Sequence, residues 1–338
     1  MSFVLHVDGE RWRAGLDRVV AERPGIVPVI KGNGYGFGRN LLCAEASRLG
    51  APTIAVGTYA EVPEALAAFG GDVLVMEPYR AAIHAGLPDL LNTRLVHTVT
   101  TSVDVESLRG VLAEARVVVE GLTSMNRFGA PVGEVGDLAA AADAVGVTLH
   151  LPLGTGHVEE IARFIAAVPR VQTWFVSHVS TRELATLAER FPDHTFRPRI
   201  GTDLWYADKG SYEVRAHVLD VRPVAKGTRV GYRQRPVAGG HLVVVSGGTS
   251  HGVAMESPSS AATLRSRAIA VTEGVLEAAH RVRSPFTVSG TTPRFAEPPH
   301  MQCSLLVLPE GATPPRVGDE VPVRMRLTTT APDAVVIS

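Results

Sequence analysis

The chain has 338 residues, of which 45% are hydrophobic and 20% are charged, and its formal net charge at pH 7 is −1. This balance gives no electrostatic reason to bind nucleic acid or an anionic membrane surface, and the length favours one large domain with a smaller one. We expect no signal peptide and no membrane span, because no long apolar run is present. The two cysteines, Cys43 and Cys303, lie far apart and suit a reducing compartment, so we expect a cytoplasmic protein.

The first two thirds of the chain alternate short β-branched runs with amphipathic segments. Residues 3–7 predict a strand and residues 9–22 a helix. Further strands are predicted at 27–30, 53–56, 73–76, 94–99, 116–120, 148–153, 173–177 and 195–200. Helices are predicted at 40–49, 60–69, 103–115, 135–145, 158–168 and 181–191, and more weakly at 80–86. Alternation at this spacing favours a (β/α)8 barrel, with a doubly wound sheet as the alternative.

After about residue 208 the helical spacing ends and strands follow one another between Gly- and Pro-rich turns. These strands are predicted at 214–221, 228–232, 241–245, 268–271, 304–308 and 321–327, and residues 257–267 are expected to be a loop. We therefore expect a barrel over residues 8–210 and a β-rich domain over residues 211–338, to which the N-terminal strand 1–7 also belongs.

The stretch 27–38 is the most distinctive in the chain. A short apolar strand ends in Lys31 and continues into a glycine-rich turn that holds Tyr35. The carboxyl end of a barrel strand is where this fold places its chemistry. Partly apolar surroundings disfavour the charged form of an amine and lower its pKa, so Lys31 would be able to attack a carbonyl. The alternative is a surface lysine that merely ends a strand.

Other polar residues follow later strands of the predicted barrel. Arg127 comes after the fifth strand, Ser180 after the seventh, and Gly201 and Thr202 after the eighth. Loops after the seventh and eighth strands usually bind phosphate in this fold, because backbone N–H groups converge there. A lysine opposite a phosphate site suggests pyridoxal phosphate, bound covalently to the lysine.

Several of these motifs resemble those of the alanine racemases, in the same order. The segment Lys31-Gly-Asn-Gly-Tyr35-Gly-Phe-Gly is similar to the family's cofactor motif, in which the lysine binds pyridoxal phosphate and the tyrosine reaches its phosphate. The segment Ser124-Met-Asn-Arg127-Phe-Gly resembles the loop whose arginine holds the substrate carboxylate. The resemblance extends from Phe3 to about residue 323.

The end of the predicted barrel continues this resemblance. Arg199-Ile-Gly201-Thr202 is similar to the segment whose arginine faces the pyridine nitrogen and whose backbone amides bind phosphate. Ser180 stands where the family has a phosphate-binding serine. The resemblance therefore implies a cofactor site made of Lys31, Tyr35, Ser180, Arg199, Gly201 and Thr202.

The β-rich domain carries two further motifs of the family. Gly227-Thr-Arg-Val-Gly-Tyr232 resembles the segment that holds the second catalytic base, and Met301 resembles a methionine beside the substrate. The resemblance implies a racemase for alanine or a related amino acid, with Lys31 and Tyr232 as bases on opposite faces of the substrate carbon. In the family this tyrosine comes from the other subunit, so a homodimer with shared active sites is implied.

Each of these residues also has a plainer interpretation. Arg127 could pair with a carboxylate at a helix start, Tyr232 could be a packing residue, Ser180 could be only a helix N-cap, and Met301 could be a wall of a pocket. Histidines 150, 157, 178 and 251 lack metal-ligand spacing, so no metal site is expected. The glycine-rich run at 247–252 lacks the strand–helix context of a phosphate loop.

The chain departs from the family pattern mainly on the substrate side. A carbamylated lysine of the family is replaced by Glu120, which could supply a carboxylate directly. A histidine that supports the ring-nitrogen arginine is replaced near Pro152, with His150 as a possible substitute. The tyrosine of a pocket-lining segment is missing near Gly248, and an aspartate is replaced by Gln302. Alternatives to a racemase are therefore a decarboxylase or lyase of the same fold, or a non-catalytic homologue that binds the cofactor.

Overall fold

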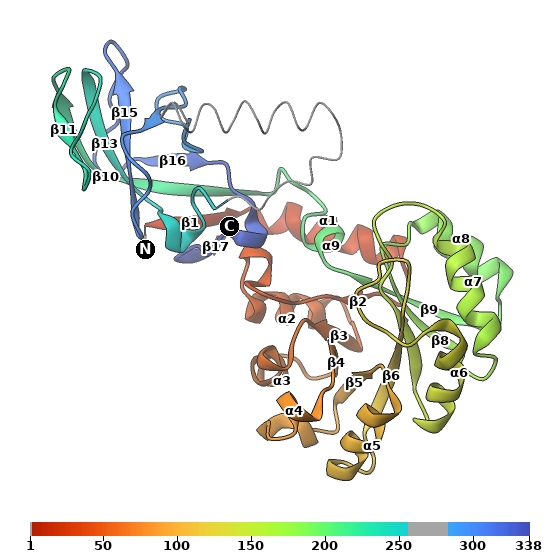
Figure 1. The fold of residues 1–338 in the computed structure, drawn as a ribbon. Helices are drawn as coiled ribbons and strands as arrows, with labels where there is room; N and C mark the ends of the chain where they lie inside the picture. Colours follow the sequence, from red (N-terminus) through yellow and green to blue (C-terminus); the bar gives the residue numbers. More distant parts are fainter. Residues whose placement is uncertain (1, 256–282) are drawn as a thin grey trace. The chain divides into compact units, whose positions relative to one another are not determined.

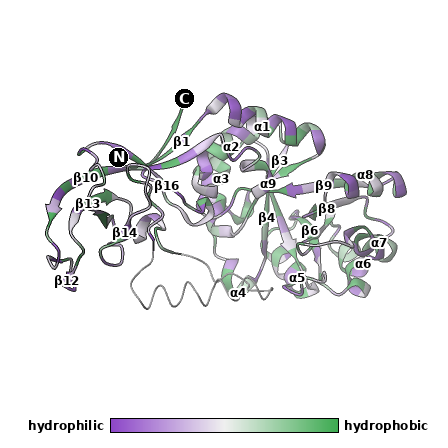
Figure 2. Ribbon diagram, turned by 90° about the horizontal axis from the view of Figure 1, so that it is seen from above, coloured by the Kyte–Doolittle hydropathy of each residue, from purple (hydrophilic) through white to green (hydrophobic). Residues whose placement is uncertain are grey.

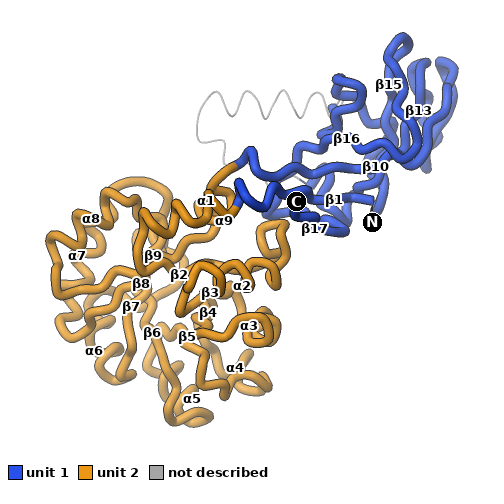
Figure 3. The backbone as a smooth tube through the Cα atoms, turned by 180° about the vertical axis from the view of Figure 1, so that it is seen from behind, with its two compact units in different colours: residues 1–12, 209–338 blue, residues 13–208 orange. Residues whose placement is uncertain are grey.

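The computed structural model describes residues 2–255 and 283–338 (Figure 1). The chain divides into two compact units, one made of residues 13–208 and the other of residues 1–12 and 209–338 (Figure 3). The strand expected at 268–271 and the loop expected at 257–267 lie outside the described residues.

Residues 13–208, all of them described, form a parallel sheet of eight strands in the order β2-β9-β8-β7-β6-β5-β4-β3. The strands are β2 (Val27–Pro28), β3 (Thr53–Val56), β4 (Asp72–Pro78), β5 (Leu95–Val99), β6 (Arg116–Gly121), β7 (Gly146–Leu149), β8 (Thr173–Ser177) and β9 (Thr195–Ile200). A parallel bridge between Val29 and Ala55 joins the two ends of this order, and Ile30 N donates to Ala55 O at 2.7 Å. The sheet is thus a nearly closed barrel, so the barrel prediction is confirmed and the doubly wound alternative is wrong.

Helices alternate with these strands and lie outside them (Figure 1). They are α1 (Gly9–Glu22), α2 (Arg39–Arg48), α3 (Val62–Ala68), α4 (Ala81–His84), α5 (Ser102–Val111), α6 (Val132–Ala141), α7 (His157–Ala167), α8 (Thr181–Arg190) and α9 (Thr202–Trp205). Two of them begin with reciprocal capping boxes, Thr101 with Asp104 for α5 and Ser180 with Glu183 for α8. These caps satisfy backbone N–H groups that a helix start leaves unpaired.

The interior of the barrel has an apolar core, and polar residues lie toward the carboxyl ends of the strands. Seven buried residues form its core: Val27, Val29, Ala55, Leu74, Val96, Val118 and Phe175. Successive side chains of a strand alternate between the two faces of a sheet, so Glu120 lies on the same inner face of β6 as Val118. In Figure 2 strands such as β4 are hydrophobic, while the surrounding helices mix both kinds of residue. The carboxyl ends of the strands therefore carry the polar residues of the barrel.

The second unit is built on one mainly antiparallel sheet with the strand order β14-β15-β13-β10-β1-β17, in which β16 also pairs with β10. Its strands are β1 (Phe3–Val7), β10 (Tyr212–Val224), β13 (Gly240–Ser246), β14 (Arg294–Phe295), β15 (Cys303–Pro309), β16 (Glu320–Val323) and β17 (Ala334–Ile337). A separate hairpin joins β11 (Arg229–Val230) to β12 (Arg235–Pro236). The β-rich domain expected from the sequence is confirmed.

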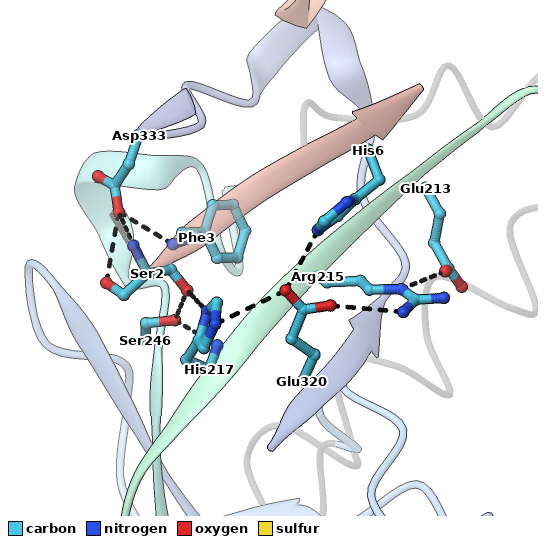
Figure 4. Close-up of polar contacts among 9 residues, drawn as sticks. All are labelled: Ser2, Phe3, His6, Glu213, Arg215, His217, Ser246, Glu320 and Asp333. Atoms are coloured by element: carbon cyan, nitrogen blue, oxygen red, sulfur yellow. Dashed lines mark hydrogen bonds and ion pairs between the residues drawn. The ribbon is translucent and has the colours of Figure 1, made fainter. Parts of the chain in front are cut away.

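Polar side chains tie the N-terminal strand into this sheet (Figure 4). Asp333 accepts hydrogen bonds from the backbone N–H groups of Ser2 and Phe3 at 3.0 and 2.9 Å. Burial opposes the charge of this carboxylate, but these bonds and the contact with His251 lower the pKa of Asp333 to about 2. Glu320 carries a second cluster, in which its oxygens lie 3.3 Å from His6, 3.6 Å from His217 and 3.4 Å from Arg215.

Several predicted strand boundaries differ from the structure, and two strands were predicted to extend about four residues too far at the carboxyl end. The run expected at 148–153 forms β7 at Gly146–Leu149, because the chain leaves the sheet before Pro152, which has no N–H to donate. The run expected at 321–327 ends at Val323, and Leu327 begins a 3-10 turn. The short strands β12, β14 and β17 were not predicted.

Candidate active site

Lys31 follows β2 at the carboxyl end of the barrel strands, beside the turn after β3. A Cβ atom at Gly57 would lie 3.1 Å from the Cβ of Lys31, so glycine leaves the room that the lysine needs. Glu61 joins the two turns, because its carboxylate oxygens accept hydrogen bonds from Gly32 N and Gly57 N, each at 2.6 Å. The start of the lysine side chain is thus fixed by two neighbouring strand ends.

The charge on the Lys31 amine is disfavoured by its surroundings. Partial burial is the main cause of a lowered pKa, and the guanidinium groups of Arg127 and Arg199 lower it further, against the opposing effect of Glu61. A lysine whose pKa is lowered in this way has a larger share of the neutral amine, which is the form that attacks a carbonyl. Lys31 is nevertheless an exposed residue, so its nucleophilic role stays a prediction beside that of a plain surface lysine.

Tyr35 is buried in the glycine-rich turn that follows Lys31 and lies against the end of β9. Its backbone has a φ of +55°, which residues other than glycine rarely adopt. Tyr206 donates a hydrogen bond to its carbonyl oxygen at 2.9 Å. A Cβ at Gly201 would come within 2.0 Å of the Tyr35 hydroxyl. Burial raises the pKa of Tyr35, so the phenol stays neutral and can donate a hydrogen bond next to Gly201 and Thr202.

Arg199 and Glu120 are the two buried charged residues of the site. Arg199 on β9 is 5% exposed, and its Nε and Nη2 atoms have no hydrogen-bond partner among the described residues. Glu120 on β6 is 1% exposed, and burial raises its pKa to about 7 although Arg199 and Arg127 oppose the shift. Buried N–H donors are normally satisfied, so the two unpartnered nitrogen atoms of Arg199 indicate a site where a ligand supplies the acceptor.

The loop that carries Arg127 is held by two carboxylates. Glu120 Oε1 lies 4.0 Å from Arg127 Nη2. Glu160 on α7 accepts hydrogen bonds from Ser124 N at 2.6 Å and from Ser124 Oγ at 2.8 Å. The arginine side chain is 42% exposed, so its guanidinium can still reach a ligand. An anchored but accessible arginine of this kind suits a carboxylate ligand.

Two histidines lie at the ends of β7 and β8. The rings of His150 and His178 are 5.3 Å apart, and His150 Nδ1 is 3.2 Å from the Ser177 hydroxyl. Burial, with help from Arg199 and other cations, lowers the pKa of His150 to about 3, so the imidazole is neutral. His178 has a φ of +59° and donates from Nδ1 to Leu151 O at 2.6 Å. His150 is thus a neutral ring whose pKa responds to the charge of Arg199, and its role in supporting that arginine stays a prediction.

Ser180 is the N-cap of α8. Its hydroxyl accepts a hydrogen bond from Glu183 N at 3.2 Å and donates to Glu183 Oε2 at 2.7 Å, and Ser180 N also donates to this carboxylate at 2.9 Å. The capping role considered from the sequence is therefore present. A phosphate at Ser180 would have to displace the Glu183 carboxylate, so phosphate binding by this serine stays a prediction.

Tyr232 and Met301 belong to the other unit, where they line one open cavity of about 640 Å³. We call this the Tyr232 cavity; Glu297, His300 and Cys303 also line it. Tyr232 lies in the turn between β11 and β12 and is 85% exposed, and Met301 is 72% exposed. Within this unit the Tyr232 side chain is mostly uncovered and contacts the ring of His300, and its catalytic role stays a prediction.

Comparison with known proteins decides the family. A family model described as the alanine racemase N-terminal domain matches residues 10–202. The chain belongs to the alanine racemase family. An alanine racemase of Sorangium cellulosum is 25% identical over 245 residues, which is 63% of this chain and 63% of that protein. The aligned part thus spans less than two thirds of that relative.

Solved structures share the fold over the whole chain. The alanine racemase of Bartonella henselae with covalently bound pyridoxal phosphate has a TM-score of 0.73 at 14% identity and covers 100% of this chain and 99% of its own. A histidine racemase of Leuconostoc mesenteroides has a TM-score of 0.70 at 15% identity and covers 100% of this chain and 98% of its own. At these identities the likeness shows the fold alone.

Several residues of this family member were not singled out from the sequence. Glu61 and Glu160 support the loops of Lys31 and Arg127, and Glu297 and His300 lie beside Tyr232. The three-residue spacing of Glu297 and His300 was a weak signal, and Thr58 with Glu61 has the spacing of a capping box. Glu160 acts across the fold and left no such signal. The described residues contain no helix long and apolar enough to span a membrane, and no cluster of metal-binding side chains was found among them.

Proposed function

We propose that the protein is a pyridoxal-phosphate-dependent amino-acid racemase that works by two-base proton transfer. Membership of the alanine racemase family supports a racemase in general terms. The observation that carries the proposal is that Lys31 follows β2, the strand that pairs with β9, and that β9 carries the buried Arg199, whose Nε and Nη2 atoms lack partners among the described residues. An amine nucleophile and an unsatisfied donor at one end of the barrel match the two ends of a pyridoxal ring.

The residues of the barrel fit this cofactor. Lys31 would hold it covalently, Arg199 would donate to its ring nitrogen, and the Tyr35 hydroxyl with the backbone at Gly201 and Thr202 would hold its phosphate. When bound, the cofactor makes the α-proton of an amino acid removable by accepting electrons into its ring. Arg199 cannot give up its proton, so the ring nitrogen stays unprotonated, which limits reactions other than proton transfer.

The substrate and the protons would be handled by four side chains. Arg127, anchored by Glu120, would bind the carboxylate of the amino acid. Lys31 would move the α-proton on one face of the substrate carbon. Tyr232 would do so on the other face, supplied by the partner subunit of a homodimer, and Met301 would lie beside the substrate. Each enantiomer would then lose its proton to a different base.

The substrate is an amino acid, alanine or a related one. A fold shared with a histidine racemase supports a range of side chains on this scaffold. A decarboxylase or lyase is less well supported, because such enzymes favour an acidic partner that keeps the ring nitrogen protonated, and this chain has Arg199.

A labelling experiment tests the cofactor assignment. The protein loaded with pyridoxal phosphate is reduced with borohydride, digested and mapped by mass spectrometry. The sequence has three lysines, Lys31, Lys209 and Lys226, so the matched controls are Lys209→Ala and Lys226→Ala. We expect the label on Lys31 in the wild type and in both controls, and its loss in Lys31→Ala. A label that survives in Lys31→Ala, or no label at all, would contradict the proposal.

A further inference from the structure

Within one subunit, few contacts hold the side chain of Tyr232, although the proposed function requires its phenol oxygen to be held in one place. It lies in the four-residue turn between β11 and β12, and its side chain is 85% exposed. Exposed side chains change rotamer freely, whereas proton transfer requires the acceptor within hydrogen-bond reach of the substrate. If Tyr232 is a base, as proposed above, something in its surroundings has to restrict the phenol.

Glu297 holds the backbone of this turn. Its oxygens accept hydrogen bonds from Tyr232 N at 3.1 Å and from Arg233 N at 3.5 Å. A Cβ at Gly231, where φ is +73°, would lie 2.0 Å from the Glu297 carboxylate, so only glycine leaves room for it. The Glu297 residue is 5% exposed, and a buried carboxylate persists only when it is well paired.

His300 completes the pairing of Glu297 and also contacts the phenol. Its Nε2 atom lies 2.5 Å from Glu297 Oε1, and its ring centroid lies 4.5 Å from that of Tyr232 at an interplanar angle of 38°. The backbone of His300 is fixed on both sides, since its N donates to Cys303 O and its carbonyl accepts from Thr249 N, each at 2.9 Å. One imidazole therefore links a buried carboxylate to the face of the tyrosine ring.

We propose that Glu297 and His300 form a positioning pair that orients the Tyr232 phenol for proton transfer. Glu297 fixes the turn and the imidazole, and the imidazole limits the rotation of the phenol. Neither residue exchanges a proton with the substrate. The inference rests on the proposed function, because it gives the pair a role only if Tyr232 is a base.

The experiment is α-proton exchange in heavy water, measured for each enantiomer with the full-length protein loaded with pyridoxal phosphate. The variants are Tyr232→Phe, His300→Gln and Glu297→Gln. The matched control is His217→Gln. It removes an imidazole that lies 3.6 Å from the carboxylate of Glu320 (Figure 4). His217 is not among the residues that line the Tyr232 cavity. Exchange of the two enantiomers in one sample distinguishes an effect on one base from a general loss of folded protein.

We expect Tyr232→Phe to abolish exchange for one enantiomer and keep it for the other, which depends on Lys31. His300→Gln should slow the same enantiomer by about 100-fold through kcat, with KM and the other enantiomer unchanged, since misplacing a reacting group has effects of this size. Glu297→Gln should act in the same direction, and His217→Gln should change neither enantiomer. If Glu297→Gln fails to fold, His300→Gln alone decides.

Two results would overturn the inference in different ways. Equal slowing of both enantiomers in His300→Gln, or no slowing, would show that the pair does not act through Tyr232, and the proposed function would stand. Unchanged exchange of both enantiomers in Tyr232→Phe would remove the second base itself, and the proposed function would fall together with the pair.

Discussion

Glu120 and Arg127 are a buried anchor and an exposed partner, with Oε1 of the glutamate 4.0 Å from Nη2 of the arginine and side-chain exposures of 2% and 42%. The carboxylate lies inside the barrel on β6, and the guanidinium lies on the loop that follows this strand. Burial raises the pKa of Glu120 to about 7, so above this pH a buried charge can orient an accessible one, because the inner side chain has little freedom to move. Glu120 would therefore affect the affinity for the substrate through Arg127, without touching the substrate itself.

Replacing Glu120 by Gln should raise KM for the amino acid by about tenfold, equivalent to about 1.4 kcal/mol, and should change kcat less. The neutral amide no longer holds the Arg127 guanidinium electrostatically. Steady-state kinetics of the loaded enzyme measure this at a pH above about 7, where Glu120 is ionised. The matched control is Glu159→Gln. It breaks a surface ion pair in which Glu159 Oε1 lies 2.6 Å from Arg190 Nη1, and it should leave KM unchanged. A loss confined to kcat would contradict the anchoring role.

The free energy of unfolding should depend on pH because of Glu120. Burial raises the pKa of this carboxyl from 4.5 to about 7 in the folded state. Between these pH values the folded protein binds a proton that the unfolded chain has lost, so this group lowers stability as pH rises from about 4.5 to about 7. Because Glu120→Gln lacks this penalty, its unfolding free energy relative to wild type should improve across this range. A constant difference would show that Glu120 does not titrate there.

Gly201→Ala should weaken cofactor binding. The new methyl group would lie 2.0 Å from the Tyr35 hydroxyl and would displace the phenol from the proposed phosphate site. The expected result is a Kd for pyridoxal phosphate raised about tenfold or more, with the Kd for pyridoxal, which lacks the phosphate, changed less. Gly154→Ala is the control, because nothing lies within 4 Å of a Cβ at that glycine. Equal losses for both ligands would place the phosphate elsewhere.

Gly248 has no room for a side chain. A Cβ there would lie 2.1 Å from His300 O and 2.6 Å from the carbonyl carbon of Met301. Gly248→Ala should therefore destabilise the protein by about 2 kcal/mol, as overpacking commonly does. Denaturant unfolding measures this effect, and an unchanged midpoint would show that the backbone at His300 can move.

The same glycine bears on the substrate. The bulky side chain that the resemblance places near residue 248 is absent, so we predict that alanine need not be the preferred substrate. Comparing kcat/KM for alanine, serine and larger amino acids tests this prediction. A strong preference for alanine would contradict it.

Much of the barrel was predictable because its strands are continuous apolar runs between segments of helical spacing. The strand at Thr53–Val56 and the helix at Gly9–Glu22 match their predictions, since periodicity and length agree there. The strand before His150 was placed too late, because Leu149 and Leu151 extend the apolar run while the backbone has already left the sheet. Two-residue strands such as Arg235–Pro236 carry no periodic signal at all.

The candidate site was predictable only where a motif is local. Lys31 and Tyr35 share one glycine-rich turn, and Arg199 and Gly201 share one strand end, so the sequence pointed to both. Glu160, by contrast, reaches the Ser124 amide from a helix 36 residues away in the sequence. The contact between Glu297 and Tyr232 spans 65 residues in the same way. Such pairs depend on the fold, which one sequence does not display.

Under the proposed function, Lys31 and Tyr232 remove the α-proton from opposite faces of one amino acid. The most direct measurement is deuterium exchange at the α-carbon of separate D- and L-amino acids in heavy water, with wild-type protein loaded with pyridoxal phosphate. We predict exchange from both enantiomers of at least one amino acid, together with their interconversion. Cofactor-loaded protein that exchanges only one enantiomer, or none, would contradict it.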